Sequence, residues 1–292
     1  MRILSLIPSA TEIVFALGLD DDLVGVTEEC DFPVGARSKP SVSAPVVPAG
    51  SAGDIDATVK DAVAEGRPLY DLDVGLVREL RPDLILAQDI CRVCAVPSGD
   101  VADALAHLGT EAEVLSLDPR DLEGVFDSIR LVAERAGRAS AGGDLVGVLE
   151  ARVVEVRRAV EHAQPSPRTV CLEWSDPPFV AGNWIPEMVA AAGGTPAIGR
   201  AGEPSFEISW QDVADNEPDV IVHMPCGYDL DGSIAQSAPL PAGAAREVWV
   251  VDSTAYFSRP GPRLVDGIEI LAHILHPELV APPPTGRAER LR

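Results

Sequence analysis

Short apolar segments alternate with longer amphipathic segments along the whole chain. The apolar segments are typical of buried strands in a parallel sheet, and they predict strands at 3–7, 23–26, 84–87, 113–117, 169–173, 220–223 and 248–252. Between them, apolar residues recur at helical spacing and predict helices at 13–17, 71–80, 98–108, 121–136, 185–192, 210–216 and 263–275. This alternation predicts an α/β protein with doubly wound, mainly parallel sheets.

The segment 143–162 is the longest polar-rich predicted helix, with charged residues between its apolar positions. That pattern is expected of a helix that spans two lobes. A length of 292 residues also favours two domains over one. We therefore predict two Rossmann-like lobes joined by a long bridging helix, with an N-terminal α/β lobe at 1–138, the bridging helix at 139–164, a C-terminal α/β lobe at 165–280 and a disordered Pro- and Arg-rich tail at 281–292.

Local signals refine some of these boundaries. Ser9 and Glu12 have the spacing of a capping box, which would tie the first helix to the end of the first strand. Ser98 can cap the helix that ends near Leu108. Residues 40–56 are rich in Pro, Ser, Ala and Gly and predict an irregular surface loop.

The formal net charge of −23 argues against nucleic acid as a partner, because binding phosphates requires a basic face. No apolar run reaches the length of about 18 residues that suggests a membrane span. Met1 and Arg2 lead directly into the first strand, without the apolar stretch and cleavage site of a secretory signal. We therefore expect a cytoplasmic monomer; removal of a signal before this start would make the protein extracytoplasmic instead.

In open α/β sheets, ligands bind beyond the carboxyl ends of the strands. The loops at those ends hold several of the chain's few aromatic residues, as a cleft for a large planar ligand requires. We expect a small-molecule ligand in the cleft between the lobes, with contacts from Ser9, Ala10, Cys30, Cys91, Cys94, Trp174, Trp184, Cys226, Tyr228, Tyr256, Phe257 and Arg259.

Several of these residues also have a purely structural interpretation. Trp174 and Trp184 could pack beneath their loop. Arg259 follows Tyr256 in a turn fixed by two prolines and a glycine, where it could hold a propionamide, phosphate or carboxylate, or only cap a helix or balance surface charge. His223 ends a buried strand, and a satisfied structural histidine is favoured over a ligand there.

Cys91 and Cys94 have the spacing of a zinc half-site or a redox pair. If Cys30 and Cys226 converged with them, the four thiols could bind zinc, iron or the cobalt of a corrinoid; otherwise they are inert loop cysteines. Cys171 lies inside a predicted strand and is expected in the core. The odd number of cysteines, five, argues against a disulfide framework.

No motif of a catalytic nucleophile is present. The chain has no GxSxG elbow, no Walker-type phosphate loop and no GxGxxG after a strand. These absences weigh against a hydrolase, a nucleotide-binding protein and a dehydrogenase, and we do not expect an enzyme.

In several places the chain resembles the helical-backbone metal receptor family, the substrate-binding proteins of iron-chelate and vitamin B12 importers. The matching segments run in order from the first strand to about residue 280, at 5–12, 16–18, 23–27, 30–33, 81–85, 192–194 and 217–221. The resemblance implies a rigid bridging helix, and ligand contacts in the loops 8–11, 174–184 and 256–259. Glu173–Trp174, the CxxC pair and the 256–262 run look like a cytoplasmic-type branch that binds cobalamin.

The family's exported members dock on an ABC permease through an acidic residue on each lobe. Glu187 matches the C-terminal acid, whereas the N-terminal position falls on Val74 or Gly75, next to Asp73. The leading hypothesis is thus a receptor for a corrinoid or another metal chelate. The alternatives are a thiol-metal protein or enzyme with zinc or iron, and an importer component; the sequence leaves the identity of the ligand open.

Overall fold

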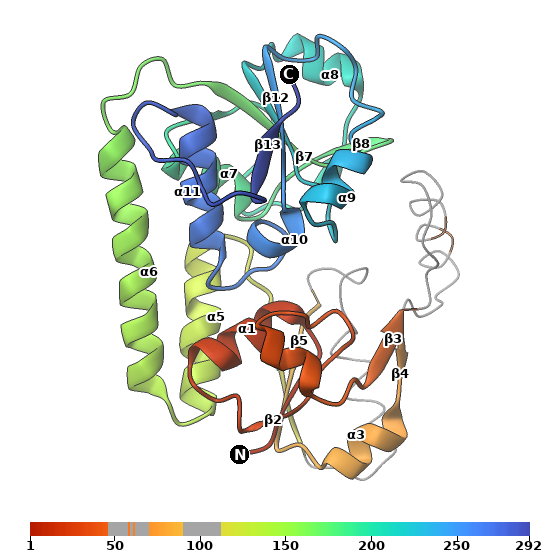
Figure 1. The fold of residues 1–292 in the computed structure, drawn as a ribbon. Coiled ribbons are helices and arrows are strands. Elements are labelled where there is room, and N and C mark those ends of the chain that lie inside the picture. Colours follow the sequence, from red (N-terminus) through yellow and green to blue (C-terminus); the bar gives the residue numbers. More distant parts are fainter. Residues whose placement is uncertain (46–57, 59–60, 62–69, 90–111) are drawn as a thin grey trace. The chain divides into compact units, whose positions relative to one another are not determined.

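The computed structural model describes residues 1–45, 58, 61, 70–89 and 112–292, which belong to two compact units (Figure 1). Unit 1 comprises 1–119 and 126–146, and unit 2 comprises 120–125 and 147–292. The predicted long helix is present as α6, Ala139–Val160, and starts at 139 instead of 143. Its first residues belong to unit 1 and the rest to unit 2. Helix α5, Leu122–Arg135, is likewise divided between the units.

Unit 1 is built on a sheet of four parallel strands in the order β2-β1-β5-β6. All four were predicted from their apolar segments: β1 Ile3–Ser5, β2 Leu23–Gly25, β5 Leu84–Ala87 and β6 Glu113–Ser116. The smaller elements of unit 1 are α1 Pro8–Ala16, the 3-10 helix η1 Val34–Ser38, α3 Val74–Leu80, and the antiparallel pair β3 Ser43–Pro45 and β4 Tyr70–Leu72. The β-sheet core contacts α3 through a cluster that includes Leu4, Leu6, Val42, Val77 and Ile85.

Two predicted helix starts in unit 1 are wrong. Helix α1 begins at Pro8, so Ser9 and Glu12 lie inside it and form no capping box. Proline suits this first position because its missing N–H is not needed there. Helix α3 begins after Asp73, whose side chain accepts the Leu76 N–H at 2.9 Å. The predicted helix at 98–108, its cap Ser98 and most of the predicted 40–56 loop lie outside the described residues.

Unit 2 contains a larger mixed sheet in which β7, β11 and β12 are parallel neighbours. These are the three predicted strands of this lobe: β7 Arg168–Ser175, β11 Val220–His223 and β12 Glu247–Val251. Short strands that the sequence did not predict extend it: β8 Pro178–Val180, β9 Thr195–Pro196 and β10 Phe206–Glu207. The helices that lie wholly in this unit are α7 Ile185–Ala191, α8 Trp210–Asp215, α9 Leu230–Ala235, α10 Ser253–Tyr256 and α11 Leu264–Leu275.

The end of the chain contains a strand, although we predicted a disordered tail at 281–292. Residues Ala288–Arg290 form β13, which pairs antiparallel with β12 beside it in Figure 1. The pairing covers the hydrogen-bonding groups that an edge strand would otherwise expose. None of the helices in the described part of the chain combines the length and apolarity needed to cross a bilayer.

Candidate functional site

In unit 2, three adjacent parallel strands end at one edge of the sheet and carry predicted ligand residues there. Trp174 lies at the end of β7, Cys226 and Tyr228 follow β11, and Tyr256 and Arg259 follow β12. The carboxyl ends of parallel strands meet at the same edge, so these loops become neighbours although they are far apart in sequence. We call these five residues the carboxyl-edge surface.

Hydrogen bonds join the three loops to one another. The Cys226 N–H donates to the Glu173 carbonyl of β7 at 3.2 Å, and the Thr254 N–H donates to the Tyr228 carbonyl at 3.0 Å. The buried Ser253 hydroxyl donates to the Met224 carbonyl at 2.8 Å. Each loop is therefore fixed to its neighbour, which favours a preformed binding surface.

Two aromatic rings form the first part of this surface. The rings of Trp174 and Tyr228 have centroids 6.1 Å apart and are tilted by 40°. Gln236 Nε2 donates to the Tyr228 hydroxyl at 3.3 Å. The Trp174 indole N–H is buried without a hydrogen-bond partner among the described residues, as is the Thr254 hydroxyl. Such orphaned buried donors are uncommon in folded proteins.

Burial shifts the acids of the surrounding loops toward their neutral forms. Burial raises the pKa of Glu173 to about 6, although a hydrogen bond with the Ser205 hydroxyl acts in the opposite direction. The pKa of Asp252 is also raised by burial, while the Ala255 amide and the charges of Arg263 and Arg259 oppose this. Both carboxyl groups therefore keep their protons to a higher pH than free carboxyl groups do.

Trp184 and Phe257 have a supporting position instead. They are only 6% and 2% exposed, and the Trp184 indole N–H donates to the Phe257 carbonyl at 2.9 Å. This bond ties the start of α7 to the end of α10. Trp184 is therefore packed beneath its loop, which is one of the two interpretations that the sequence left open.

In unit 1, the predicted contacts Ser9 and Ala10 are buried at the start of α1, just after β1. Cys30 is 2% exposed, and its sulfur lies 3.1 Å from both the Thr11 and the Thr27 hydroxyl oxygens. These residues follow the adjacent strands β1 and β2, so the sequence rule also groups them correctly at one edge.

Only part of the predicted set of metal-binding thiols lies among the described residues. Cys91 and Cys94 lie outside the described residues, and Cys226 is half-buried. Among the described residues, no three His, Cys, Asp or Glu side chains are grouped so that they could hold a metal ion. Cys171 is buried in β7 as predicted, and burial raises the pKa of its thiol.

His223 is buried at the end of β11, but it is not the satisfied histidine that the sequence favoured. Neither ring nitrogen has a hydrogen-bond partner among the described residues. Burial lowers the pKa of His223 to about 4, against a smaller opposing effect from the Gln236 backbone. The ring is therefore held neutral.

Glu187, the expected docking acid, and Asp73, which lies next to the N-terminal docking position, both have partners within their own units. Glu187 Oε2 accepts the N–H of Leu122, the first residue of α5, at 2.8 Å. Asp73 caps α3. Sequence spacing alone could not reveal the hydrogen bond between Leu122 and Glu187.

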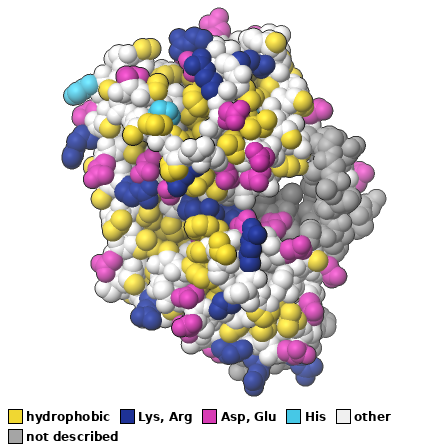
Figure 2. Space-filling model, viewed as in Figure 1, with side chains coloured by type: hydrophobic (Ala, Val, Ile, Leu, Met, Phe, Trp, Pro, Cys, Tyr) yellow, Lys and Arg dark blue, Asp and Glu magenta, His cyan; other side chains and the backbone are white. Residues whose placement is uncertain are grey.

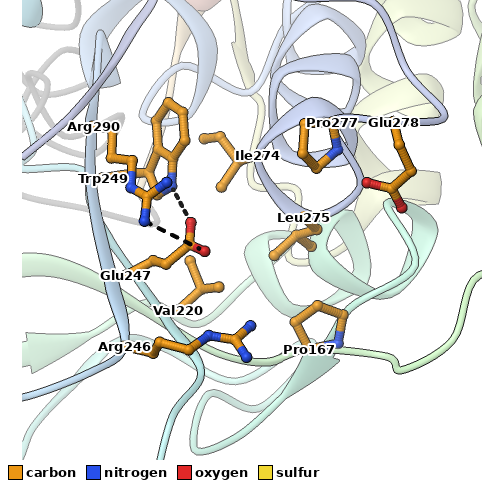
Figure 3. A pocket seen from close by; sticks show the side chains of 10 residues that line it. All are labelled: Pro167, Val220, Arg246, Glu247, Trp249, Ile274, Leu275, Pro277, Glu278 and Arg290. Atoms are coloured by element: carbon orange, nitrogen blue, oxygen red, sulfur yellow. Dashed lines mark hydrogen bonds and ion pairs between the residues drawn. The ribbon is translucent and has the colours of Figure 1, made fainter. Parts of the chain in front are cut away.

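A separate hollow of about 420 Å³ lies at the opposite edge of unit 2's sheet, at the amino ends of β11 and β12 (Figure 3). Its polar groups partly satisfy one another, because Glu247 accepts from Trp249 Nε1 at 3.3 Å and pairs with Arg290 at 3.6 Å. The strand rule places ligands at the other edge, so we assign no ligand to this hollow.

The family model of the periplasmic binding proteins matches residues 3–253. The chain belongs to the periplasmic binding protein family. A vitamin B12-binding protein of Vibrio cholerae serotype O1 (strain ATCC 39315 / El Tor Inaba N16961) is 24% identical to it over 279 residues, covering 92% of this chain and 86% of the relative. A substrate-binding lipoprotein of an ABC transporter from Bacillus subtilis (strain 168), described as uncharacterized, is 24% identical over 294 residues, with 95% and 80% covered.

Solved structures confirm the fold of this periplasmic binding protein. A periplasmic heme-binding protein from Pseudomonas aeruginosa aligns with a TM-score of 0.73 and 23% identity, covering 99% of this chain and 97% of that one. A periplasmic vitamin B12-binding protein of Vibrio cholerae aligns with a TM-score of 0.63 and 22% identity, covering 94% and 96%. The two-lobed α/β architecture and the resemblance to importer substrate-binding proteins are thereby confirmed.

The relatives also bear on location. Their names describe periplasmic proteins and a lipoprotein. These comparisons do not support the expected cytoplasmic location.

Proposed function

We propose that this periplasmic binding protein captures a corrinoid or a similar metal chelate outside the cytoplasm and delivers it to an ABC permease. The observation that carries the proposal is the carboxyl-edge surface of unit 2. Its rings and its arginine stand on three hydrogen-bonded loops at the edge where open α/β sheets bind ligands.

The chemistry of this surface suits a macrocyclic chelate. The rings of Trp174, Tyr228 and Tyr256 can contact the apolar face of a corrin or porphyrin. Arg259 can donate to a peripheral amide, phosphate or carboxylate group. Ser9, Ala10 and Cys30 of unit 1 are at most 3% exposed, so we propose a supporting position for them, as for Trp184 and Phe257. The vitamin B12-binding and heme-binding relatives support this class of ligand.

Nothing in this arrangement requires a catalytic step. Burial keeps His223 neutral at pH values well above its pKa of about 4, and it raises the pKa of Glu173 to about 6. A binding protein needs only affinity and release, so we propose a receptor without enzymatic activity.

The test is co-elution of the purified protein with a chelate in gel filtration. Cyanocobalamin, hemin and a ferric siderophore are each incubated with the protein and followed by visible absorbance. We expect about one equivalent of one chelate to elute with the protein. If none of the three co-elutes, the proposal is wrong.

Elemental analysis of the protein as isolated addresses the thiol-metal alternative. Stoichiometric zinc or iron, bound without any added chelate, would favour that alternative. We expect neither metal at stoichiometric level.

A further inference from the structure

The C-terminal tail of the chain reaches the carboxyl-edge surface. Strand β13 runs antiparallel to β12, with Ala288 opposite Val251. One residue further, the Asp252 N–H donates to the Arg287 carbonyl at 3.0 Å. Backbone pairing therefore places Arg287 at the carboxyl end of β12, where the chain enters α10 and the loop with Tyr256.

The Arg287 side chain contacts both Tyr256 and α11. Its guanidinium carbon lies 4.7 Å from the centroid of the Tyr256 ring, and its Nη1 donates to Asp266 Oδ1 at 3.1 Å. Arg263 lies 5.7 Å from the same ring. A guanidinium this close to an aromatic ring is attracted to it, and partial burial reduces screening by salt.

Asp266 connects this contact to the helices of unit 2. It also lies 3.5 Å from Arg152 of α6, which forms two hydrogen bonds of 2.9 and 2.8 Å with Glu269 of α11. Arg287 is therefore held by fixed elements, while Tyr256 belongs to a short helix and the turn that follows it. An arginine held in this way can restrain the ring.

We propose that Arg287 is a positioning residue, which holds Tyr256 and the loop after β12 in the geometry that binds the ligand. This inference rests on the proposed function, because it assigns the tail a role at the same site. The inference gives Arg287 a role in the binding site, although this residue follows the segment 3–253 that the family model matches.

The first test needs no ligand. Hydrogen exchange of the amides at 253–258 is compared in the wild-type protein, Arg287→Ala, Arg287→Lys and Arg290→Ala. Arg290 is the matched control, because it lies on β13, the strand directly after Arg287, but pairs with Glu247 at the other edge. We expect Arg287→Ala to speed exchange at 253–258 by about three- to ten-fold, Arg287→Lys to restore most of the protection, and Arg290→Ala to leave it unchanged. Equal exchange in Arg287→Ala and the wild type, or equal loosening by both alanine variants, would overturn the proposal.

The second test measures the Kd of whichever chelate the wild-type protein binds. We expect Arg287→Ala to raise the Kd by about three- to ten-fold, and by less than about two-fold when Tyr256 is already replaced by Leu. Equal effects in both backgrounds would show that Arg287 does not act through Tyr256. If the wild-type protein binds no chelate, the proposed function fails, yet the exchange measurement still decides whether Arg287 restrains the loop.

Discussion

At the residue scale, burial shifts the pKa values of two ionisable groups of unit 2 in opposite directions. His223 is fully buried with a pKa lowered to about 4, and Glu173 has a pKa raised to about 6. Both shifts arise mainly from burial, which disfavours the charged form of either group. Their effects on the free energy of unfolding have opposite signs over the same pH range.

His223 makes the protein less stable in mild acid. Its folded pKa lies below its ordinary value of 6.5, so the unfolded chain takes up a proton first as the pH falls from 6.5 to 4. The stability lost over that interval is up to about 3 kcal/mol. In chemical denaturation at several pH values, we expect His223→Leu to flatten this part of the profile. The exposed His162→Gln serves as the control, and an unchanged slope in His223→Leu would contradict the account.

Glu173 has the opposite effect. Its folded pKa lies above its ordinary value of 4.5, so its favourable contribution is complete below pH 4.5 and is lost as the pH rises through 6. Glu173→Gln should therefore be more stable than the wild type above pH 6 by about 1–2 kcal/mol, and similar to it at pH 4. The same denaturation series measures this difference. A variant that is less stable than the wild type at pH 7 would show that the charged form is favoured.

At the scale of elements, the packing of α11 against α10 depends on one glycine. A Cβ at Gly267 would lie 2.2 Å from the Tyr256 carbonyl oxygen and 2.7 Å from Met188 Cε. Gly267→Ala must therefore separate the helices, at a cost of about 2 kcal/mol or more. Gly143→Ala on α6 meets nothing within 4 Å and should instead stabilise by up to about 1 kcal/mol. Thermal unfolding of the two variants checks both signs, and a neutral Gly267→Ala would refute the close approach.

The strands were the most predictable elements of the fold. Apolar segments such as 84–87 and 220–223 became strands with the predicted bounds, because a strand buried on both faces must be apolar throughout. The start of α1 and the strand β13 were not predictable in this way. The first is set by Pro8 in place of a side-chain cap, and the second by backbone pairing with β12, which accepts polar residues.

The candidate site was predictable at the level of loops rather than of side chains. The rule of carboxyl strand ends correctly brought Trp174, Tyr228 and Tyr256 to one edge, since strand order is all that it requires. It did not distinguish them from Trp184 and Phe257, which turn into the core. The contact between Arg287 and Tyr256 was not predicted, because no local sequence signal relates the end of the chain to Tyr256.

At the scale of the whole molecule, the net charge of −23 is the dominant electrostatic feature. On the face shown in Figure 2, basic side chains of the described residues are interspersed with acidic ones and form no large basic patch. Repulsion among surplus carboxylates destabilises the compact state, and salt screens it. We expect Tm to rise by several degrees when NaCl increases from about 10 mM to about 500 mM at pH 7.5. A Tm that falls with salt would mean that surface ion pairs outweigh the repulsion.

Ligand affinity on the carboxyl-edge surface decides the central claim. The chain offers a matched pair of tryptophans at opposite edges of one sheet. Trp174 lies near the carboxyl end of β7, and Trp249 lines the hollow at the amino edge. Isothermal titration of the co-eluting chelate into Trp174→Ala and Trp249→Ala compares the two edges directly. We predict that Trp174→Ala raises the Kd by about ten-fold or more, whereas Trp249→Ala stays within about two-fold of the wild type. Normal affinity in Trp174→Ala together with lost affinity in Trp249→Ala would contradict the account.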